Sequence, residues 1–347
     1  MKKIESYTAH KQTGILLNAN EVSNNVSDEI RQEIKNMIDT VDFNRYPDDT
    51  YSDLLEAYSN YIHVPANQIL CGNGSDQMLD LIMSYYLSKG KTLYTIDPDF
   101  GMYDYYATKF DAKVLKFKCE EDGSFDIDAF IQYGKENHVD MVIFSNPNNP
   151  SGHYLKNEDV LKIVEAFKDI PFVDDEAYIE FADESMMEYI GKYPNFYITR
   201  TLSKIFGMAA IRTGFLIGSK ENMEQLYKIK VPYALNTLSQ QVAMIALGHI
   251  DEVMDRVKPI VKNREMILSY PYQDIKAFDS QANFIMLKAS QLDVLKQMFE
   301  DENIVIRTYQ NKDYIRITIG NDEQSKKVFE LLKEYDRKVA YERSIVR

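Results

Sequence analysis

Two stretches decide the fold: Val173-Asp174-Asp175-Glu176-Ala177-Tyr178 and Thr201-Leu202-Ser203-Lys204. In each, an apolar run ends directly before or at charged residues. The apolar runs predict strands over Phe172 to Asp174 and over Tyr197 to Thr201. A third strand is predicted from Arg212 to Gly218. Open α/β sheets carry their ligands at the carboxyl ends of the strands. We therefore expect the charged residues that follow these strands to gather at one site.

Short apolar runs alternate with longer amphipathic segments on both sides of this stretch. Strands separated by helix-sized segments require crossover connections, which favour a mostly parallel sheet. Further strands are predicted at 69–71, 92–96, 113–117 and 141–145, with helices at 77–87 and 157–167. After Gly218 the pattern predicts long helices to about residue 269, short strands at 283–287, 305–307 and 314–319, and a closing helix.

These elements predict an α/β protein with a mostly parallel central sheet flanked by helices and a smaller α+β domain. We expect residues 40–240 to form the large domain. The small domain is expected to combine an N-terminal arm, residues 1–39, with residues 241–347.

Composition narrows the classes of function. The formal net charge of −14 over 347 residues disfavours non-specific binding to nucleic acid, whose phosphates would be repelled. Cys71 and Cys119 are the two cysteines, too few for a disulfide framework or a CxxC metal site, and they fit a reducing, cytoplasmic setting. The N-terminus lacks an apolar signal core, and no apolar run approaches 18 residues, so no membrane partner is expected.

Lys204 and Asp175 together suggest a specific chemistry. A buried ammonium is costly unless something neutralises or uses it. One use is a Schiff base to pyridoxal 5'-phosphate, whose pyridinium nitrogen then needs an anionic partner such as Asp175. The simpler interpretation of Lys204 is a surface lysine, and Asp174 to Glu176 could instead be a solvated turn or a hard-cation site. We expect the cofactor and no metal.

The order and spacing of short motifs strengthen this interpretation. Across nearly the whole chain the sequence resembles the fold-type I, class I/II pyridoxal-phosphate-dependent aminotransferases, and among them most of all the histidinol-phosphate aminotransferases. The motifs that carry the resemblance are 17–21 (LNANE), 45–48 (RYPD), 72–76 (GNGSD), 99–103 (DFGMY), 146–152 (NPNNPSG), 175–178 (DEAY), Ser203-Lys204, Arg212 and 314–318 (YIRIT).

The resemblance implies roles for residues around the cofactor ring. Lys204 would attach the cofactor and later shuttle a proton, and Asp175 would hold the ring nitrogen protonated. Tyr178 and Asn149 would donate hydrogen bonds to the ring's phenolate oxygen, with Tyr178 on the same side of an incipient helix as Asp175. Asn149, lying before a proline, could instead only shape a turn. Phe100 would stack on the ring, although an aromatic residue there could equally belong to the core.

The resemblance also implies a phosphate cup and a dimer. Ser75 and Asp76 fall between a strand and a helix, where free backbone N–H groups and the helix dipole favour an anion. Ser203 and Arg212 would complete the cup, Arg212 as a fork-shaped cation. In relatives, Tyr46 reaches the cofactor phosphate from the neighbouring subunit. A homodimer is therefore expected.

Two arginines are the candidates for substrate recognition. In the glutamate half-reaction Arg316 is the candidate for a bidentate pair with the substrate α-carboxylate. The resemblance places Arg307 against the phosphate of histidinol phosphate, although Arg307 could simply emerge into solvent. Asn20 and Asn236 match positions near the substrate without a firm role. The chain departs from the family pattern at Ser151, where threonine is usual, and at Val22-Ser23, where Asn-Pro is usual. The segment between the two arginines is also short.

Transamination between L-glutamate and imidazole acetol phosphate, as part of histidine biosynthesis, is the leading functional prediction. Three alternatives remain open. One is transamination of phenylalanine, tyrosine or another amino acid. Another is a pyridoxal-phosphate lyase similar to threonine-phosphate decarboxylase. The last is a non-catalytic, cofactor-binding regulator, which the acidic charge and the lack of a DNA-binding module disfavour.

Overall fold

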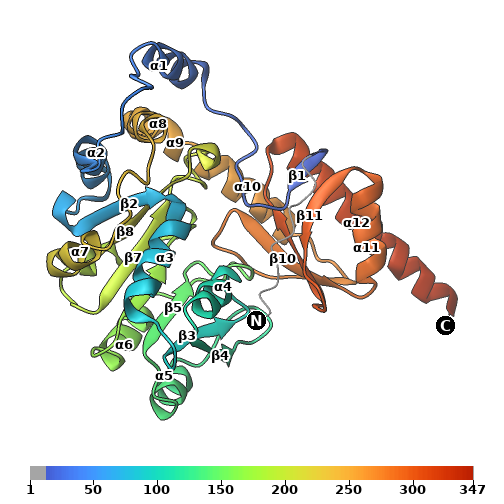
Figure 1. Ribbon diagram of the computed structural model, residues 1–347. Coiled ribbons are helices and arrows are strands. Elements are labelled where there is room, and N and C mark those ends of the chain that lie inside the picture. The colour runs from blue at the N-terminus through green and yellow to red at the C-terminus, as the bar shows by residue number, and fades with distance from the viewer. Residues whose placement is uncertain (1–12, 347) are drawn as a thin grey trace.

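The computed structural model describes residues 13–346, which form a larger and a smaller body with helix α10 (Val257–Leu268) between them (Figure 1). The larger body contains a seven-stranded sheet in the order β2-β8-β7-β6-β5-β3-β4. Its strands are β2 (Ile69–Asn73), β3 (Thr92–Asp97), β4 (Lys113–Lys118), β5 (Met141–Ser145), β6 (Phe172–Asp175), β7 (Phe196–Thr201) and β8 (Thr213–Ile217). Strand β8 runs antiparallel to both of its neighbours and the remaining pairs are parallel, which confirms the predicted mostly parallel sheet.

Alternation of side chains along the strands gives the sheet two apolar faces. On β6, Val173 packs with one core cluster and Phe172 with the other. The first face is covered by α3 (Gly74–Tyr86), α4 (Met102–Lys109) and α7 (Lys220–Tyr227). The second is covered by α2 (Ser52–Ile62), α5 (Ile127–Glu136), α6 (Asn157–Ala166) and α8 (Thr237–Gly248). Helices on both faces bury the central strands β5, β6 and β7 along their whole length, whereas the edge strand β4 stays partly exposed.

The smaller body has a five-stranded sheet in the order β1-β11-β12-β10-β9. Its strands are β1 (Ile15–Leu17), β9 (Ile275–Ala277), β10 (Phe284–Ala289), β11 (Ile304–Thr308) and β12 (Tyr314–Thr318). Its helices are α11 (Leu292–Asp301) and α12 (Asp322–Val346), and the red end of α12 extends beyond the body in Figure 1. The N-terminal arm enters this sheet, because β1 pairs in parallel with β11.

The arm also contacts the larger body. Helix α1 (Asp28–Ile38), capped by the Ser27 hydroxyl, packs against α8, and the short helix α9 (Ile250–Met254) follows α8. The predicted strands and helices are all present, with ends that differ by a few residues, whereas β1 and β9 were not predicted. The division into residues 40–240 and residues 1–39 with 241–347 stays a prediction, and residues 1–12 lie outside the described part of the chain.

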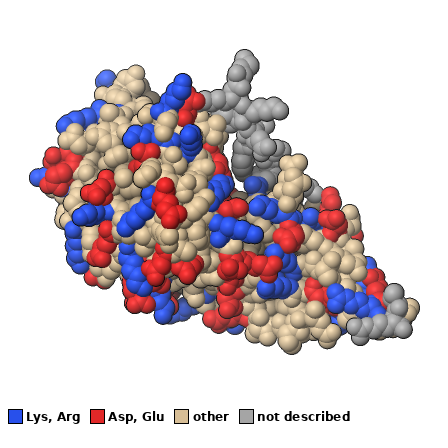
Figure 2. All heavy atoms as spheres, turned by 90° about the horizontal axis from the view of Figure 1, so that it is seen from below, with Lys and Arg blue, Asp and Glu red and all other residues tan. Residues whose placement is uncertain are grey.

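Surface properties agree with the composition. Acidic and basic side chains are interspersed over the face seen in Figure 2. Cys71 and Cys119 are buried free thiols. Across residues 13–346, no helix combines the length and apolar character needed to cross a membrane.

Candidate active site

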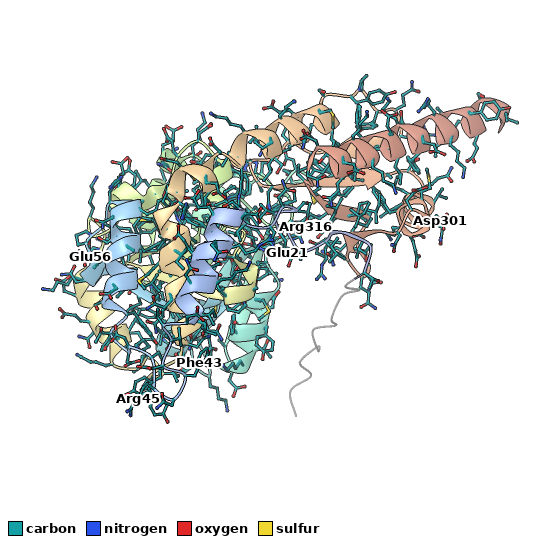
Figure 3. The ribbon with its side chains drawn as sticks, turned by 90° about the horizontal axis from the view of Figure 1, so that it is seen from above. Glu21, Phe43, Arg45, Glu56, Asp301 and Arg316 are labelled. Atoms are coloured by element: carbon teal, nitrogen blue, oxygen red, sulfur yellow. The ribbon has the colours of Figure 1, made fainter. Side chains whose placement is uncertain are left out.

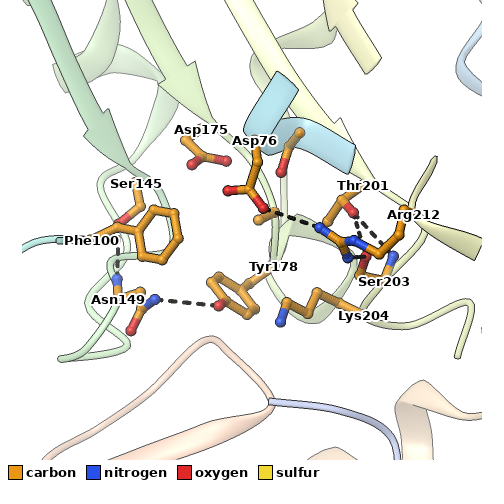
Figure 4. A pocket seen from close by; sticks show the side chains of 12 residues that line it. Asp76, Phe100, Ser145, Asn149, Asp175, Tyr178, Thr201, Ser203, Lys204 and Arg212 are labelled. Carbon is orange, nitrogen blue, oxygen red and sulfur yellow. Dashed lines mark hydrogen bonds and ion pairs between the residues drawn. The ribbon is translucent and has the colours of Figure 1, made fainter. Parts of the chain in front are cut away.

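A pocket of about 510 Å³ opens where β5, β6 and β7 end, on the side facing the smaller body (Figure 4). Every candidate cofactor residue of this chain except Tyr46 lines it. The lining residues are Ser75, Asp76, Phe100, Ser145, Asn149, Asp175, Ala177, Tyr178, Thr201, Ser203, Lys204 and Arg212. The residues that follow the predicted strands therefore gather at the carboxyl ends of the strands, where the site was expected from the sequence.

Asp175, the last residue of β6, is buried at the back of the pocket. Its Oδ2 accepts a hydrogen bond of 2.7 Å from the Tyr103 hydroxyl. Its Oδ1 has no partner among the described residues and no contact with solvent. Burial raises the pKa of Asp175 to about 6, and the bond from Tyr103 lowers it in part. An unpartnered buried carboxylate oxygen is costly, and a cation placed against it would remove that cost.

Lys204 lies three residues after β7, and its amine points into the same pocket. Its Nζ donates to the backbone oxygen of Ala19 at 3.0 Å and lies 5.6 Å from the Tyr178 ring centroid. Burial and then the charge of Arg316 lower the pKa of Lys204 to about 8, against the opposing effect of Glu21. A substantial neutral fraction therefore exists near neutral pH, and neutral amines are nucleophiles and bases.

The other end of the pocket is suited to an anion. Helix α3 begins here with Ser75 in its first turn, so its free N–H groups face the pocket. Arg212 reaches over it, donating to Asp76 at 3.0 Å and to the Ser203 hydroxyl at 3.2 Å. Strand β8 can approach this closely because residue 214 is glycine: a Cβ there would lie 2.0 Å from the Ser75 nitrogen. The structure thus brings together Ser75, Asp76, Ser203 and Arg212, the residues predicted to form a phosphate cup.

Between these two ends, amide and guanidinium groups converge near the Tyr178 hydroxyl. It accepts hydrogen bonds from Asn20 Nδ2 at 2.9 Å and from Asn149 Nδ2 at 3.4 Å. Arg316, on β12, donates to Asn149 Oδ1 and, at 2.7 Å, to the Asn18 backbone oxygen. Asn149 is thus a contact of the site and not only a turn residue. Figure 3 places Arg316 and Glu21 where the two bodies meet.

The predicted incipient helix that would place Tyr178 beside Asp175 is wrong in detail. Asp175 still belongs to β6, and the next helical segment is a 3₁₀ turn that starts at Ile179. The strand remains paired with β7 through this point, since the Glu176 nitrogen donates to the Thr199 oxygen. Both side chains nevertheless line the pocket, because the chain turns into it directly after the strand.

Three other candidates lie outside this pocket. Tyr46 is 82% exposed and stacks on Tyr233, with ring centroids 4.8 Å apart. Arg307 is the cross-strand partner of Arg316 in the β11–β12 ladder. Asn236 caps the first turn of α8 by accepting from the Ser239 nitrogen.

Sequence reasoning missed several residues of the site. Tyr103 was quoted within a motif but given no partner, although it donates to Asp175. Ser145 and Thr201 were recognised only as strand ends, and both line the pocket. Their signal was the position itself, because a hydroxyl residue closing a buried strand lies at the edge where ligands bind.

A group of possible metal ligands lies elsewhere. Glu29 and Glu33 on α1 and His249 at the end of α8 place ligand atoms within 4.8 Å of one another. The contact of 2.9 Å between His249 Nε2 and Glu33 links the two helices. This hydrogen bond accounts for the position of His249 without an ion.

The pocket fits pyridoxal 5'-phosphate on its donor chemistry. The unpartnered Asp175 oxygen suits a ring cation, the low-pKa amine of Lys204 suits an aldehyde, and Arg212 at a helix N-terminus suits a phosphate. The profile of the family "Aminotransferase class I and II" matches residues 12–332. The chain belongs to this family. The protein is accordingly an aminotransferase whose cofactor is pyridoxal 5'-phosphate and whose substrates are an amino acid and a 2-oxo acid.

Relatives within the family agree with this assignment. The chain is 34% identical to the histidinol-phosphate aminotransferase of Clostridium novyi over 93% of both chains. It is 33% identical to that of Pyrococcus furiosus over 92% of both chains. The histidinol-phosphate aminotransferase of Sinorhizobium meliloti, solved in complex with pyridoxal 5'-phosphate, has the same fold: TM-score 0.85 at 20% identity, covering 94% of this chain and 91% of that one.

Proposed function

We propose that this aminotransferase is a histidinol-phosphate aminotransferase, which interconverts L-histidinol phosphate plus 2-oxoglutarate with imidazole acetol phosphate plus L-glutamate in histidine biosynthesis. The names of the curated relatives support this substrate pair. So does the arrangement of two arginines in the smaller sheet. We further propose a cytoplasmic location, in keeping with the free thiols of Cys71 and Cys119.

The arginine pair is the observation that carries the substrate proposal. Arg307 on β11 lies directly opposite Arg316 on β12, so both side chains project from the same face of the sheet. Like charges directly opposite one another are unfavourable. Arg316 is buried, and Arg307 lies over the Tyr309 ring at 5.4 Å. A substrate with two negative charges would relieve the repulsion: glutamate carries two carboxylates, and histidinol phosphate carries a phosphate that is itself a dianion.

Each residue of the pocket has a task in this proposal. When bound, the cofactor supplies an aldehyde for covalent attachment and a ring that accepts electrons from the substrate Cα. Lys204 provides the attaching amine and, once released, takes the Cα proton, for which its lowered pKa suits it. Asp175 keeps the ring nitrogen protonated. Tyr178 and Asn149 hydrogen-bond the ring oxygen, and Arg316 orients the α-carboxylate of glutamate.

We also propose that the enzyme acts as a homodimer in which Tyr46 reaches the cofactor phosphate of the neighbouring subunit. The support is the exposed stack of Tyr46 on Tyr233, with the exposed apolar residues Phe43 and Val231 close to them in sequence. Phe43 and Arg45 project together from the loop after α1 (Figure 3). An exposed apolar cluster marks a binding surface more often than free surface, and symmetric dimers are the commonest soluble oligomers.

The test compares substrates on the purified, cofactor-loaded protein. Glutamate should convert the loaded protein to the pyridoxamine form, and failure to do so would rule out transamination. Imidazole acetol phosphate should then be preferred over phenylpyruvate as acceptor. A reversed preference would indicate an aromatic aminotransferase, and release of carbon dioxide from phosphothreonine would indicate the lyase.

Arg307→Ala isolates the recognition of the phosphate. The change should lower kcat/KM for imidazole acetol phosphate by roughly tenfold to a hundredfold, the value of a charge-assisted hydrogen bond, and leave phenylpyruvate nearly unaffected. The matched control is Arg31→Ala on the exposed face of α1, where the arginine pairs with Asp28 at 3.5 Å. Equal losses on both acceptors would remove the role assigned to Arg307.

A further inference from the structure

A carboxylate just outside the pocket, that of Asp99, is surrounded by hydrogen-bond donors. Asp99 lies between β3 and α4 and immediately precedes Phe100, whose nitrogen donates to Oδ1 at 2.8 Å. Ser145 donates to it from both its hydroxyl and its backbone nitrogen. Asn148 Nδ2 and the Thr95 hydroxyl each donate at 3.2 Å. Asp99 therefore joins the end of β3 to the end of β5 and to the loop that follows β5.

The Ser145 hydroxyl connects this carboxylate to the site. While it donates to Asp99, its oxygen accepts from the Asn149 backbone nitrogen at 2.9 Å. Ser145 is buried, so water does not compete for these bonds. Because a hydroxyl has one proton, the direction in which Ser145 donates fixes which lone pair faces Asn149. Asp99 thereby sets the position of the Asn149 backbone.

Asn149 in turn contacts Tyr178 of the larger body and Arg316 of the smaller one. Its Nδ2 donates to the Tyr178 hydroxyl, and its Oδ1 accepts from Arg316 of the smaller sheet. A displacement of Asn149 would disturb the hydrogen bonding around Tyr178 and the orientation of Arg316 together. Loss of an ångström at such a position can reduce catalysis strongly.

We propose that Asp99 is a positioning residue: through the Ser145 hydroxyl it fixes Asn149, so that the Asn149 amide meets Tyr178 on one side and Arg316 on the other. The inference rests on the proposed function in that Asn149 and Tyr178 are taken to face the cofactor ring. It goes beyond that function because Asp99 does not itself line the pocket.

If residue 99 served packing alone, a buried carboxyl group would be an unfavourable side chain at this position. Burial raises the pKa of Asp99 to about 8, and the hydrogen bonds from Ser145 and Phe100 oppose that rise. A neutral side chain would avoid the desolvation of a charge. A carboxyl group accepts several hydrogen bonds at once, whether it is ionised or protonated, which suits a residue that must hold a loop in one position.

Two variants test the linkage from its two ends. Asp99→Asn keeps the shape but replaces one acceptor by a donor, and Ser145→Ala removes the hydroxyl and leaves Asp99 in place. The matched control is Asp336→Asn in the smaller body, where a buried carboxylate accepts backbone bonds from Gln273 and Asp274 far from the pocket. It reports what losing a buried acceptor does to the fold alone.

The first readout is the pH at which the visible absorbance of the cofactor-loaded protein titrates. Weaker hydrogen bonding to the ring oxygen should move this midpoint upward by about half a pH unit or more in Asp99→Asn and Ser145→Ala, as in Asn149→Ala. Asp336→Asn should not move it, even if it unfolds at a lower temperature. An unchanged midpoint in both Asp99→Asn and Ser145→Ala would overturn the proposal.

The second readout is a double-mutant cycle on kcat/KM for glutamate. Asp99→Asn alone should lower kcat/KM by about tenfold or more. In a protein that already carries Asn149→Ala, the same change should lower kcat/KM by less than about twofold, because Asp99 acts through Asn149. Additive losses would overturn the proposal. If Asp99→Asn does not fold, the same cycle with Ser145→Ala decides. Absence of any glutamate conversion in the unmodified enzyme would instead refute the proposed function, while the absorbance midpoints would still test the linkage.

Discussion

Replacing Asp175 by asparagine should change the stability of the cofactor-free and the cofactor-loaded protein in opposite directions. Asp175 is buried, its Oδ1 has no partner among the described residues, and its pKa is raised to about 6 from an ordinary 3.8. Because the folded-state pKa is the higher one, the stability present below about pH 4 is lost as the pH rises through 6. The difference between the two pKa values lowers the free energy of unfolding by about 3 kcal/mol once the carboxyl is fully ionised.

Without cofactor, the asparagine variant escapes this cost. It should be more stable than the unmodified protein by up to about 3 kcal/mol near pH 8, and by about half as much near pH 5. With cofactor the sign reverses, because the ring nitrogen loses its anionic partner. A hydrogen bond to a charged group is worth about 1.5–3 kcal/mol, so cofactor affinity should fall roughly tenfold to a hundredfold.

Urea unfolding at both pH values, with and without pyridoxal 5'-phosphate, measures both effects, and a cofactor titration measures the affinity. Asp336→Asn again serves as the control, since a buried carboxylate that accepts backbone N–H groups should lose stability in both states. The reasoning is refuted if the Asp175→Asn protein without cofactor is less stable than the unmodified protein near pH 8, or if cofactor affinity is unchanged.

Three further outcomes are expected. Because only the neutral Lys204 amine can attack an aldehyde, cofactor uptake by the cofactor-free protein should accelerate with rising pH and level off above about 8, and borohydride trapping followed by peptide mass analysis should find the label on Lys204. Tyr46→Phe should alter the free energy of unfolding by less than about 0.5 kcal/mol because the side chain is exposed. Mixing Tyr46→Phe subunits with Lys204→Ala subunits should nevertheless give more activity than either variant alone. An activity no higher than that of the separate variants would contradict a shared site. Arg200→Met should cost about 3–5 kcal/mol in urea unfolding, since it leaves the buried carboxylates of Glu176 and Glu180 unpaired, and adding Glu176→Gln and Glu180→Gln should recover much of the loss.

The sequence predicted the large sheet well because its strands are continuous apolar runs. Strand β5, Met141–Ser145, is buried along its whole length and has the predicted bounds. Strands β1 and β9 are three residues each, too short for any periodicity to appear. Their existence depends on partners distant in sequence: Ile15 of β1 pairs with Ile304 of β11. Such pairing has no local signal.

Site residues could be predicted where the residue type has few structural roles at that position. They could not be predicted where the residue acts through hydrogen bonds to other side chains. Lys204 is anomalous after an apolar strand, and Asp175 closes the preceding strand, so together they indicated the chemistry. Tyr103 and Ser145 are ordinary residue types, and their roles follow from hydrogen bonds to Asp175 and Asp99 that only the folded chain brings together. Arg307 was assigned by resemblance, whereas its register against Arg316 is a property of the ladder.

The three successive acidic residues Asp174, Asp175 and Glu176 lie in different surroundings because of the geometry of the strand. Successive side chains of a strand point to opposite faces, so Asp175 enters the pocket while Asp174 and Glu176 face the other way. Glu176 is neutralised by Arg200 at 2.6 Å and accepts from the Met186 nitrogen. Asp174 has no hydrogen-bond partner among the described residues, and burial together with repulsion from Glu176 raises its pKa well above the usual range.

Burial and the neighbouring Glu176 therefore favour the neutral form of Asp174, whereas Asp175 and Glu176 have distinct hydrogen-bond partners. A hard-cation site would need the three carboxyls to converge on one point, and the alternation of β6 prevents that. Asp175 is therefore the carboxyl of this run that faces the pocket, where the other lining acid, Asp76, is already paired with Arg212. A single carboxylate there, with its free oxygen turned toward the pocket, suits one bound cation of the size of a ring nitrogen better than a metal ion that needs several oxygen ligands.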